Sequence, residues 1–494
     1  MAGSTEHPGR LWTWRDVALV AFVATVAGAL PAPMLDLPFS GSHDGWGGAF
    51  YSTAARNLGL YPLSTSWGAM LTQVGPTVAE PRAYANHPPL IVWLVAASQA
   101  LFGASEATAR VVPWTFSVLT AATATVLLRA LAVPRTLAAA GVLLAVGTPL
   151  WGRYAAMVDP QGSGPLFSMV LLPLLALVAA RRPGPAATAG LLLALPFGLL
   201  FDWPAWGSAL LVAGWLLARG PTRRAGATLM AAILFWAVLV IGWTLCLDGP
   251  VYDAPPALGF HPTEGFINRA GLKPRLLDDA GGVLSWSEVW HRIAQHHRQG
   301  LTWPLSVLAV PAVVLLLRRA LRGRAGLALL VIPGVVGLAY VLLFPQGAYT
   351  HDYWQIYLAL GAALPVVGWL AESGLPTRVP WLGPALLGMA LLLCIRSGLI
   401  VRAHATAPDL DALRHVSEAV VLRLGPARAV TSSAPRSVVI EHYTDRPIAW
   451  HADPTALGAD VAVLEPPGGA LIPAVRAARG PGEPLPGGWT LWPH

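Results

Sequence analysis

The sequence predicts an all-α protein that crosses a membrane many times, with a small α/β domain at its C-terminal end. The first observation is composition: 55% of the 494 residues are hydrophobic and only 12% are charged, roughly half the charged fraction of a soluble chain. The second is a series of long apolar segments within residues 1–400, and the third is the loss of that pattern over residues 401–494. A larger soluble core does not explain the charge deficit, because long soluble chains divide into domains, whereas a lipid solvent does.

Eleven apolar segments are predicted to span the membrane. Several are shorter than the ~20 residues that a perpendicular helix needs, and because their polar flanks are sparse we expect the helices to extend beyond them. The first segment is too long for a removable signal peptide and lacks its cleavage site. The eleven segments are 17–39, 111–131, 137–151, 165–180, 186–201, 204–218, 227–247, 303–317, 326–344, 353–370 and 381–400.

A further apolar stretch, Leu90–Phe102, follows a Pro-Pro pair and is shorter still. We predict that it forms a helix lying at the membrane interface; as a twelfth span it would invert everything downstream. Charge favours the interfacial position, because arginine then gathers on one side of the membrane, the mark of the cytoplasmic side. The short loops on the other side receive only Arg56, Arg82, Arg110 and Arg153.

This charge pattern predicts a multi-pass protein of the plasma (inner) membrane with a cytoplasmic N-terminus. The expected outer segments are the loops 40–110, 152–164, 248–302 and 345–352, together with the tail 401–494. We do not interpret the net charge of +7 as a sign of nucleic-acid binding, because it comes from an arginine-rich composition with Lys273 as the only lysine. The arginines assigned to the cytoplasmic side are Arg10, Arg15, Arg129, Arg135, Arg181, Arg182, Arg219, Arg223, Arg224, Arg318, Arg319, Arg322, Arg324 and Arg378.

The tail is expected to be a small extracytoplasmic domain that borders the site and adds no catalytic group. An amphipathic pattern over 409–424 predicts a helix, and short strands are predicted at Val430, 438–440, 460–464 and 489–492. The two cysteines, Cys246 and Cys394, lie in apolar segments, where we expect buried hydrophobic side chains and no disulfide.

Several motifs in the first outer loop occur in a fixed order. SHDGWGGAFY at 42–51 is followed by NHPPLIVWL at 86–94 and by FGASEATAR at 102–110, which leads into the second span. An acidic residue after the first span, then HPPL with a tryptophan, then FG with SE and an arginine, resembles the GT-C superfamily of membrane glycosyltransferases. Within it, the pattern is most similar to the protein O-mannosyltransferases and aminoarabinose transferases, the family-39-like group. The resemblance covers about the first two hundred residues; beyond them it is limited to hydropathy and the patch Tyr349–Tyr353.

The resemblance implies that Asp44 is the catalytic base. The family usually has an Asp-Glu pair at this place, and this chain has Asp44 followed by Gly45, which leaves one carboxylate where relatives have two. Asp36, nearer the first span, is the alternative. An Asp-Gly pair is also common in solvated turns, so the residue types alone leave a surface turn open.

A second acid is implied by the segment Arg153–Pro160, in which Asp159 matches the functional acid of relatives. Asp44 and Asp159 fall on the same side of the membrane in a topology derived without them. The alternative is that Asp159 forms a structural ion pair with Arg153. A carboxylate close to the membrane is expected to be paired or functional.

Other polar residues are candidates for substrate binding. His87, Arg56, Arg82 and Arg153 could hold a phosphate, since arginine binds phosphate with a bidentate fork; His87 could instead cap the helix that Pro88 enters. The patch with Tyr349, His351 and Tyr353 resembles an aromatic and histidine segment of the family. Its alternative is an interfacial aromatic belt with Asp352 as an N-cap, and Asp202 is likewise a plausible N-cap.

No metal or cofactor is assigned. His291, His296 and His297 lie in an amphipathic segment, 286–299, which we expect at the interface near the entrance for a lipid tail. Their spacing fits a zinc site poorly, so no metal is predicted there, and a divalent metal elsewhere is left open. The chain has no P-loop, no GxGxxG after a strand and no HExxH, which argues against nucleotide-driven chemistry.

The implied reaction transfers a sugar from a polyprenyl-phosphate donor to a hydroxyl of a lipid, glycan or protein. Asp44 would take the proton of the hydroxyl as it attacks the anomeric carbon, which inverts that centre. Asp159 would orient hydroxyl groups, and cationic side chains would neutralise the departing phosphate. The alternatives are a secondary transporter, which usually shows symmetric halves, and a membrane receptor that senses through the tail.

Overall fold

The structure is a computed structural model. It describes residues 12–61, 63–72, 83–84, 86–247, 276–277, 283–301, 303–407, 410–424, 430–432, 437–445, 448–450, 461–467, 469 and 472–493. Arg82 and most of the predicted outer loop 248–302 lie outside these residues.

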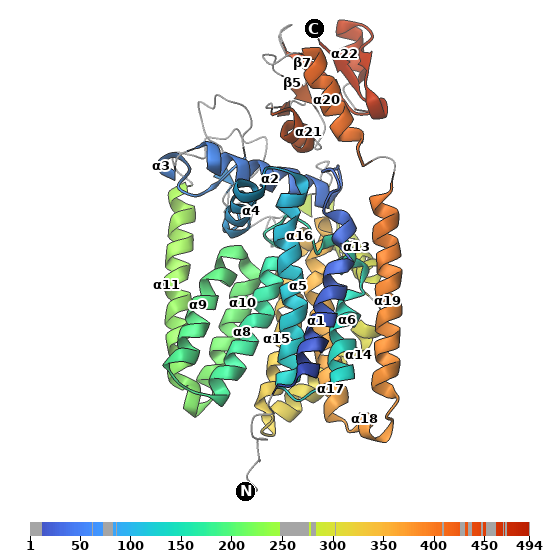
Figure 1. Ribbon diagram of the computed structural model, residues 1–494. Coiled ribbons are helices and arrows are strands. Elements are labelled where there is room, and N and C mark those ends of the chain that lie inside the picture. Colours follow the sequence, from blue (N-terminus) through green and yellow to red (C-terminus); the bar gives the residue numbers. More distant parts are fainter. Residues whose placement is uncertain are drawn as a thin grey trace.

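Each of the eleven predicted segments forms a helix, and the eleven helices stand side by side in one bundle (Figure 1). Eight helical stretches in the described part of the chain are long and apolar enough to cross a membrane on their own. The other three, α6, α9 and α10, are shorter. The helices are α1 (Trp14–Ala29), α5 (Glu106–Ala130), α6 (Arg135–Val146), α8 (Ser163–Arg181), α9 (Pro185–Phe201), α10 (Trp203–Leu217), α11 (Arg223–Leu247), α14 (Trp303–Leu321), α15 (Ile332–Leu343), α17 (Ile356–Glu372) and α19 (Leu382–Ala405).

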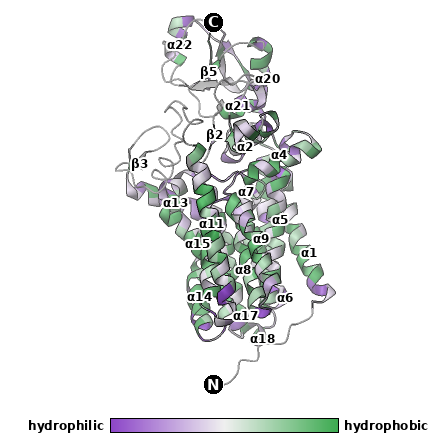
Figure 2. Ribbon diagram, turned by 90° about the vertical axis from the view of Figure 1, so that its left-hand side faces the viewer, coloured by the Kyte–Doolittle hydropathy of each residue, from purple (hydrophilic) through white to green (hydrophobic). Residues whose placement is uncertain are grey.

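The outer faces of the bundle are apolar (Figure 2). On α11, Phe235 and Val238 are exposed, and on α19 Leu392 and Leu399 are exposed. In water such continuous apolar faces would be unfavourable, whereas lipid chains solvate them. The chain is thus a polytopic membrane protein. Cys394 is buried as expected, but Cys246 is exposed, because α11 turns that face outward; both thiols are free.

Glycines allow some of these helices to approach very closely. A methyl group added at Gly361 of α17 would lie 2.3 Å from Cα of Gly334 on α15, so the two backbones touch at this point. At Gly141 of α6, an added methyl would lie 2.5 Å from a methyl group of Val367 on α17. Small residues at helix contacts are the usual means of tight packing in lipid, where no hydrophobic effect drives helices together.

Short helices lie across the end of the bundle that carries the C-terminal domain (Figure 1). The predicted interfacial helix is α4, with the same bounds, and it packs against α2 and α5. The amphipathic segment is α13, which buries Val289 and Ile293 and exposes Trp286 and Trp290. The helices at this end are α2 (His43–Leu60), α3 (Leu63–Ser66), α4 (Leu90–Phe102), α7 (Pro149–Tyr154), α13 (Trp286–Gly300) and α16 (Pro345–Thr350), with the strand pairs β1 (Met70–Leu71) with β2 (Ala83–Tyr84) and β3 (Leu276–Leu277) with β4 (Val283–Leu284).

The C-terminal domain contains a five-stranded sheet in the order β6-β5-β7-β9-β8. β5 runs parallel to both β6 and β7, and β9 runs antiparallel to β7 and β8. The strands predicted near Val430, 460–464 and 489–492 correspond to β5, β7 and β9, and the helix predicted over 409–424 corresponds to α20, which begins at Ala412. The elements are α20 (Ala412–Leu424), β5 (Val430–Ser432), α21 (Ser437–Thr444), β6 (Ile448–Trp450), β7 (Ala462–Glu465), α22 (Ile472–Arg479), β8 (Glu483–Pro484) and β9 (Thr490–Trp492).

The strand predicted at 438–440 is wrong, because these residues lie in the helix α21. The β-branched run Val438–Ile440 favours a strand locally. In the fold, however, Val439, Ile440 and Thr444 are buried, at the spacing of one helical face, where α21 packs against α2 and α20. Tertiary packing therefore overrides the local preference.

We expect Gly361→Ala to destabilise the protein by about 1–3 kcal/mol, the usual cost of forcing extra atoms into a packed core. The added methyl would collide with the backbone of Gly334. Thermal unfolding of the detergent-solubilised chain measures the effect. Gly388→Ala on α19 is the matched control, because an added methyl there meets nothing within 4 Å. Equal unfolding midpoints for both variants and the wild type would contradict the close approach of α15 and α17.

Candidate active site

Asp44 is buried in the first turn of α2, where Arg110 of α5 holds it. Their exposed fractions are 3% and 1%, and a guanidinium nitrogen of Arg110 donates to Oδ2 of Asp44 at 2.9 Å. The same guanidinium donates to the carbonyls of Met34 and Leu37. Among the described residues, Oδ1 of Asp44 is buried and has no hydrogen-bond partner. Asp44 is therefore not a solvated turn residue, and one of its oxygens remains available as an acceptor.

The structure explains why the residue after Asp44 is glycine. Ser42 caps α2, accepting from the backbone N–H of Gly45, and the chain folds back so tightly that a methyl at Gly45 would lie 2.0 Å from the backbone nitrogen of Ser40. A glutamate at position 45 would not fit this backbone, because its Cβ would collide with the chain at Ser40. Asp36, the alternative base, is exposed.

Asp159 lies beside the same helix. A methyl added at Gly47, one turn after Asp44, would lie 3.3 Å from the carbonyl of Val158 and 3.7 Å from Oδ2 of Asp159. The structure thus brings the two acids to the first turns of α2, although 115 positions separate them in the sequence (159 − 44). The approach is possible because Gly47 has no side chain on this face of α2.

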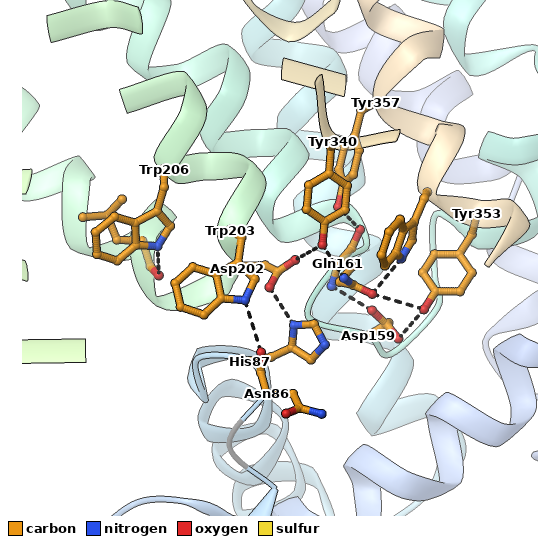
Figure 3. A network of polar contacts seen from close by, with 12 residues as sticks. Asn86, His87, Asp159, Gln161, Asp202, Trp203, Trp206, Tyr340, Tyr353 and Tyr357 are labelled. Carbon is orange, nitrogen blue, oxygen red and sulfur yellow. Dashed lines mark hydrogen bonds and ion pairs between the residues drawn. The ribbon is translucent and has the colours of Figure 1, made fainter. Parts of the chain in front are cut away.

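Asp159 is held by a network of aromatic and amide groups (Figure 3). The backbone N–H of Gln161 donates to Oδ1 at 2.7 Å, and the hydroxyl of Tyr353 donates to Oδ2 at 3.2 Å. The side chain of Gln161 accepts from Trp354 at 2.7 Å and donates to Tyr340 at 2.5 Å. Within the described residues, Arg153 forms its ion pair with Asp352, at 3.7 Å. The alternative pair between Arg153 and Asp159 is therefore not what holds Asp159 in place.

The same network continues to a buried histidine and a third carboxylate. Nδ1 of His87 lies 2.7 Å from Oδ1 of Asp202, and their exposed fractions are 1% and 0%. Because a carboxylate only accepts, Nδ1 is the donor. The hydroxyl of Tyr340 lies 3.5 Å from Oδ2 of Asp202. Asp202 is the N-cap residue of α10, as predicted, but its side chain makes no capping bond there. The N-cap residue of α4 is Pro89, so the prediction that His87 caps this helix is wrong.

A second polar cluster surrounds Asp352. Tyr154 donates to both of its oxygens at 2.8 and 2.7 Å, and Nδ1 of His43 lies 3.4 Å away. Burial and the nearby carboxylate of Asp352 raise the pKa of the Tyr154 phenol, so it stays protonated. Asp352 is thus engaged by these side chains and is not a simple N-cap; the cap position of its 3₁₀ turn is His351.

The residues of the patch Tyr349–Tyr353 lie in two different places in the structure. The rings of His43 and His351 lie 5.5 Å apart, and those of His351 and Tyr353 lie 5.2 Å apart. These residues gather near the N-terminus of α2. Tyr349, by contrast, is partly buried against the hydrophobic core.

Arg56 lies elsewhere. It pairs with Asp445 of the C-terminal domain at 2.8 Å, twelve residues along α2 from Asp44. Arg82 lies outside the described residues. Of the predicted substrate-binding residues, the structure gathers His87, Arg153, His351 and Tyr353 around the two acids, and it places Arg56 at the junction with the C-terminal domain.

Sequence reasoning missed Arg110, Asp202, Gln161 and Tyr340. A signal existed for Arg110, because it ends the FGASEATAR motif inside an apolar helix, where an arginine is expected to be paired or functional. The other three face one another from distant segments, and no local pattern marks them.

Histidines of α13 also find protein partners. His297 contacts Gln355 at 3.1 Å and Ser306 at 2.9 Å, and Nδ1 of His296 lies 3.3 Å from the carbonyl of Ala348. Burial lowers the pKa of both side chains, which keeps them neutral near pH 7. Within the described part of the chain, no three His, Cys, Asp or Glu side chains are grouped so as to hold a metal ion.

Comparison with solved structures places this arrangement in a known architecture. No protein-family profile and no curated protein sequence matches the chain. The structure of ArnT from Cupriavidus metallidurans bound to undecaprenyl phosphate is similar over 97% of this chain and 98% of its own, with a TM-score of 0.65 and 14% identity. ArnT in the apo state is similar over 96% and 97%, with a TM-score of 0.60 and 13% identity. Over nearly its whole length this chain shares the GT-C fold of the aminoarabinose transferase ArnT, and the resemblance inferred from its N-terminal motifs is confirmed at the level of fold.

Proposed function

We propose that the chain is a membrane glycosyltransferase that moves a sugar from a polyprenyl-phosphate donor to an acceptor hydroxyl, with inversion and with Asp44 as the base. The observation that carries the proposal is the state of the Asp44 carboxylate: Arg110 holds Oδ2, and Oδ1 is buried without a partner in the described chain. A buried acceptor left unsatisfied is unfavourable by about 1–3 kcal/mol, and the proton of a substrate hydroxyl would satisfy it.

The chemistry asks for one strong base. A polyprenyl phosphate leaves without protonation, so the difficulty is the weak nucleophilicity of the acceptor hydroxyl. Oδ1 of Asp44 would accept the hydroxyl proton while the oxygen attacks the anomeric carbon from the face opposite the phosphate. Arg110 positions the carboxylate, because three acceptors fix its guanidinium.

Asp159 is suited to orient hydroxyl groups. Its two oxygens already accept from Gln161 and Tyr353, which fixes the carboxylate in place, and preorganised groups of this kind contribute without reorganisation during the reaction. The departing phosphate would be met by cationic groups at the N-terminus of α2. Arg153 is the foremost candidate, because its Nε is buried without a partner in the described structure. His87, His351 and Tyr353 complete the proposed substrate contacts.

A polyprenyl-phosphate partner is supported by the ligand of the similar ArnT structure, undecaprenyl phosphate. That ligand belongs to a protein that is 14% identical to this chain.

We expect Asp44→Asn to lower sugar transfer by about 10²–10⁴-fold, the usual contribution of a general base, and to leave undecaprenyl phosphate binding unchanged. Transfer is measured in proteoliposomes with the cell's own donor lipids, and binding is measured by native mass spectrometry. Asp411→Asn, at an exposed position, is the matched control. Full transfer by the Asp44 variant would remove the base assignment, and a wild type that binds no polyprenyl phosphate would remove the proposed donor.

A second prediction separates structure from function in the His87–Asp202 pair. Asp202→Leu should destabilise the protein by about 3–5 kcal/mol, because it leaves a buried partner uncompensated. The double variant His87→Phe, Asp202→Leu should recover most of that stability and still bind undecaprenyl phosphate at least tenfold more weakly. Chemical unfolding and lipid binding measure the two effects. A double variant with wild-type lipid binding would show that the pair only connects α4 to α10.

The orientation is also a proposal. The N-terminal end of α1 and the C-terminal domain lie at opposite ends of the bundle (Figure 1), and the arginine distribution favours a cytoplasmic N-terminus. Reporter tags inserted after Arg182, Arg224 and Arg324 should therefore score as cytoplasmic, and a tag after His494 should score as external. A cytoplasmic score for the last tag would reverse the side of the membrane on which Asp44 and Asp159 act.

A further inference from the structure

We propose that the cavity between α2, the start of α5 and the C-terminal domain binds an anionic group, a carboxylate or a phosphate, carried by the acceptor. The proposal rests on the glycosyltransferase function proposed above and adds a second site to it. We refer to this space as the junction cavity. Its volume is about 250 Å³, enough for one charged group and the sugar ring that bears it.

Most residues that line the junction cavity have polar or charged side chains, although about half of the lining surface is apolar. Five helices from segments far apart in the sequence contribute side chains, together with the short loop that precedes α5. The charged and hydrogen-bonding residues of the wall include Ser52 and Arg56 of α2, Glu106 of α5, Arg414 of α20, and His442 and Tyr443 of α21.

Two hydrogen-bond donors of this wall have no partner in the described structure. The hydroxyl of Ser52 belongs to a side chain that is 1% exposed, and Nε of Arg56 is likewise buried. The other end of the Arg56 guanidinium is anchored by Asp445 at 2.8 Å, so its position is fixed. Buried donors are nearly always satisfied in folded proteins, and unpaired donors in the wall of a cavity indicate a ligand that supplies acceptor oxygens.

The charges of the wall favour an anion over a neutral or cationic ligand. Two guanidinium groups, those of Arg56 and Arg414, face one carboxylate, Glu106, which already accepts from the Tyr443 hydroxyl at 2.8 Å. Within the described residues, the ion pair of Arg414 is with the exposed Glu418, at 3.5 Å, an interaction of about 0–1 kcal/mol that a ligand could replace. Arginine forks match carboxylate and phosphate oxygens.

His442 adds a neutral polar group to this wall. Burial, with the nearby charge of Arg56, lowers the pKa of His442 to about 3. It is therefore uncharged at physiological pH, with Nδ1 2.9 Å from the hydroxyl of Thr53. The positive charge of the junction cavity comes from the two arginines alone.

The junction cavity is connected to the proposed base by direct contacts. The Tyr443 hydroxyl accepts from the backbone N–H of Phe39 at 2.7 Å. The Phe39 ring lies 5.1 Å from the His442 ring on one side and 4.9 Å from the Arg110 guanidinium on the other, and Arg110 holds Asp44. Ser52 follows Asp44 by about 12 Å along the helix axis, at ~1.5 Å per residue.

This spacing assigns the anionic group to the acceptor. The hydroxyl under attack must reach Asp44, and a group that binds Ser52 and Arg56 would belong to a neighbouring unit of the same acceptor molecule. The departing phosphate of the donor must lie beside the reacting carbon and cannot occupy this distant position. The C-terminal domain would thus select acceptors by charge, without taking part in the chemistry.

The test measures binding of small anions to the full-length chain in nanodiscs saturated with undecaprenyl phosphate, so that the proposed donor site is already filled. The probes are inorganic phosphate and methyl glucuronide, with neutral methyl glucoside as the reference. We expect at least one anion to bind saturably and the glucoside not to bind; the anion that binds distinguishes a phosphorylated from a carboxylated acceptor.

Variants locate the binding. Arg56→Gln with Arg414→Gln should weaken anion binding at least tenfold, and Ser52→Ala should weaken it severalfold with no change of charge. The charge-matched control is Arg423→Gln with Arg476→Gln, on exposed parts of the same domain, which should bind as the wild type does. Asp445→Asn removes the ion pair between Arg56 and the C-terminal domain but no hydrogen-bond donor of the cavity wall. This variant should still bind the anion, which separates the effect of the wall donors from that of the domain contact.

Three results would overturn the proposal: a wild type that binds neither anion, a wild type that binds the glucoside equally well, or an arginine double variant that binds as the wild type does. None depends on Asp44. If Asp44→Asn keeps full transfer while anion binding maps to the junction cavity, the base assignment fails and the anion site stands. If undecaprenyl phosphate fails to bind, the proposed donor fails independently.

Discussion

The buried ion pair between Asp44 and Arg110 is the interaction on which the organisation of one end of the bundle depends, the end that carries the C-terminal domain. A single arginine joins α5 to α2 and to the chain that leaves α1, because its guanidinium also donates to the carbonyls of Met34 and Leu37. Burying two charges is unfavourable unless further hydrogen bonds compensate, and here the backbone carbonyls supply them. The result is a rigid frame around one carboxylate oxygen.

Glycine in α2 makes the rest of the frame possible. Gly45 lets the chain before the helix fold back against it, Gly48 accommodates the ring of Phe39, and Gly47 admits the segment that carries Asp159. Glycine lowers the intrinsic stability of a helix, so α2 is stable only because it is enclosed between the bundle, α4 and the C-terminal domain. The glycines thus lower the intrinsic helix stability of α2 and in exchange allow close packing where Asp44 and Asp159 approach each other.

Hydropathy predicted the membrane helices well because lipid imposes one strong constraint, an unbroken apolar helix, on each segment. The prediction failed where several weak preferences compete: Val438–Ile440 favours a strand by residue type but packs as a helix. For the candidate site, motifs in the first third of the chain pointed to Asp44 and Asp159, and the fold brings both acids to the first turns of α2. No motif pointed to Asp202 or Tyr340, since each is one polar residue at the end or within an apolar helix, and its partner lies in another segment. Only the three-dimensional contact between His87 and Asp202, 115 residues apart, gives them a role.

The hydrogen bond between Phe39 and Tyr443 has a consequence for how the protein is made. It joins residues 404 positions apart, almost the whole chain, and it lies next to the arginine that holds Asp44. During synthesis the spans insert one after another from the N-terminal end, so this hydrogen bond forms only after the C-terminal domain has been made. A chain with every span in place but without the C-terminal domain would therefore lack this contact beside the arginine that holds Asp44.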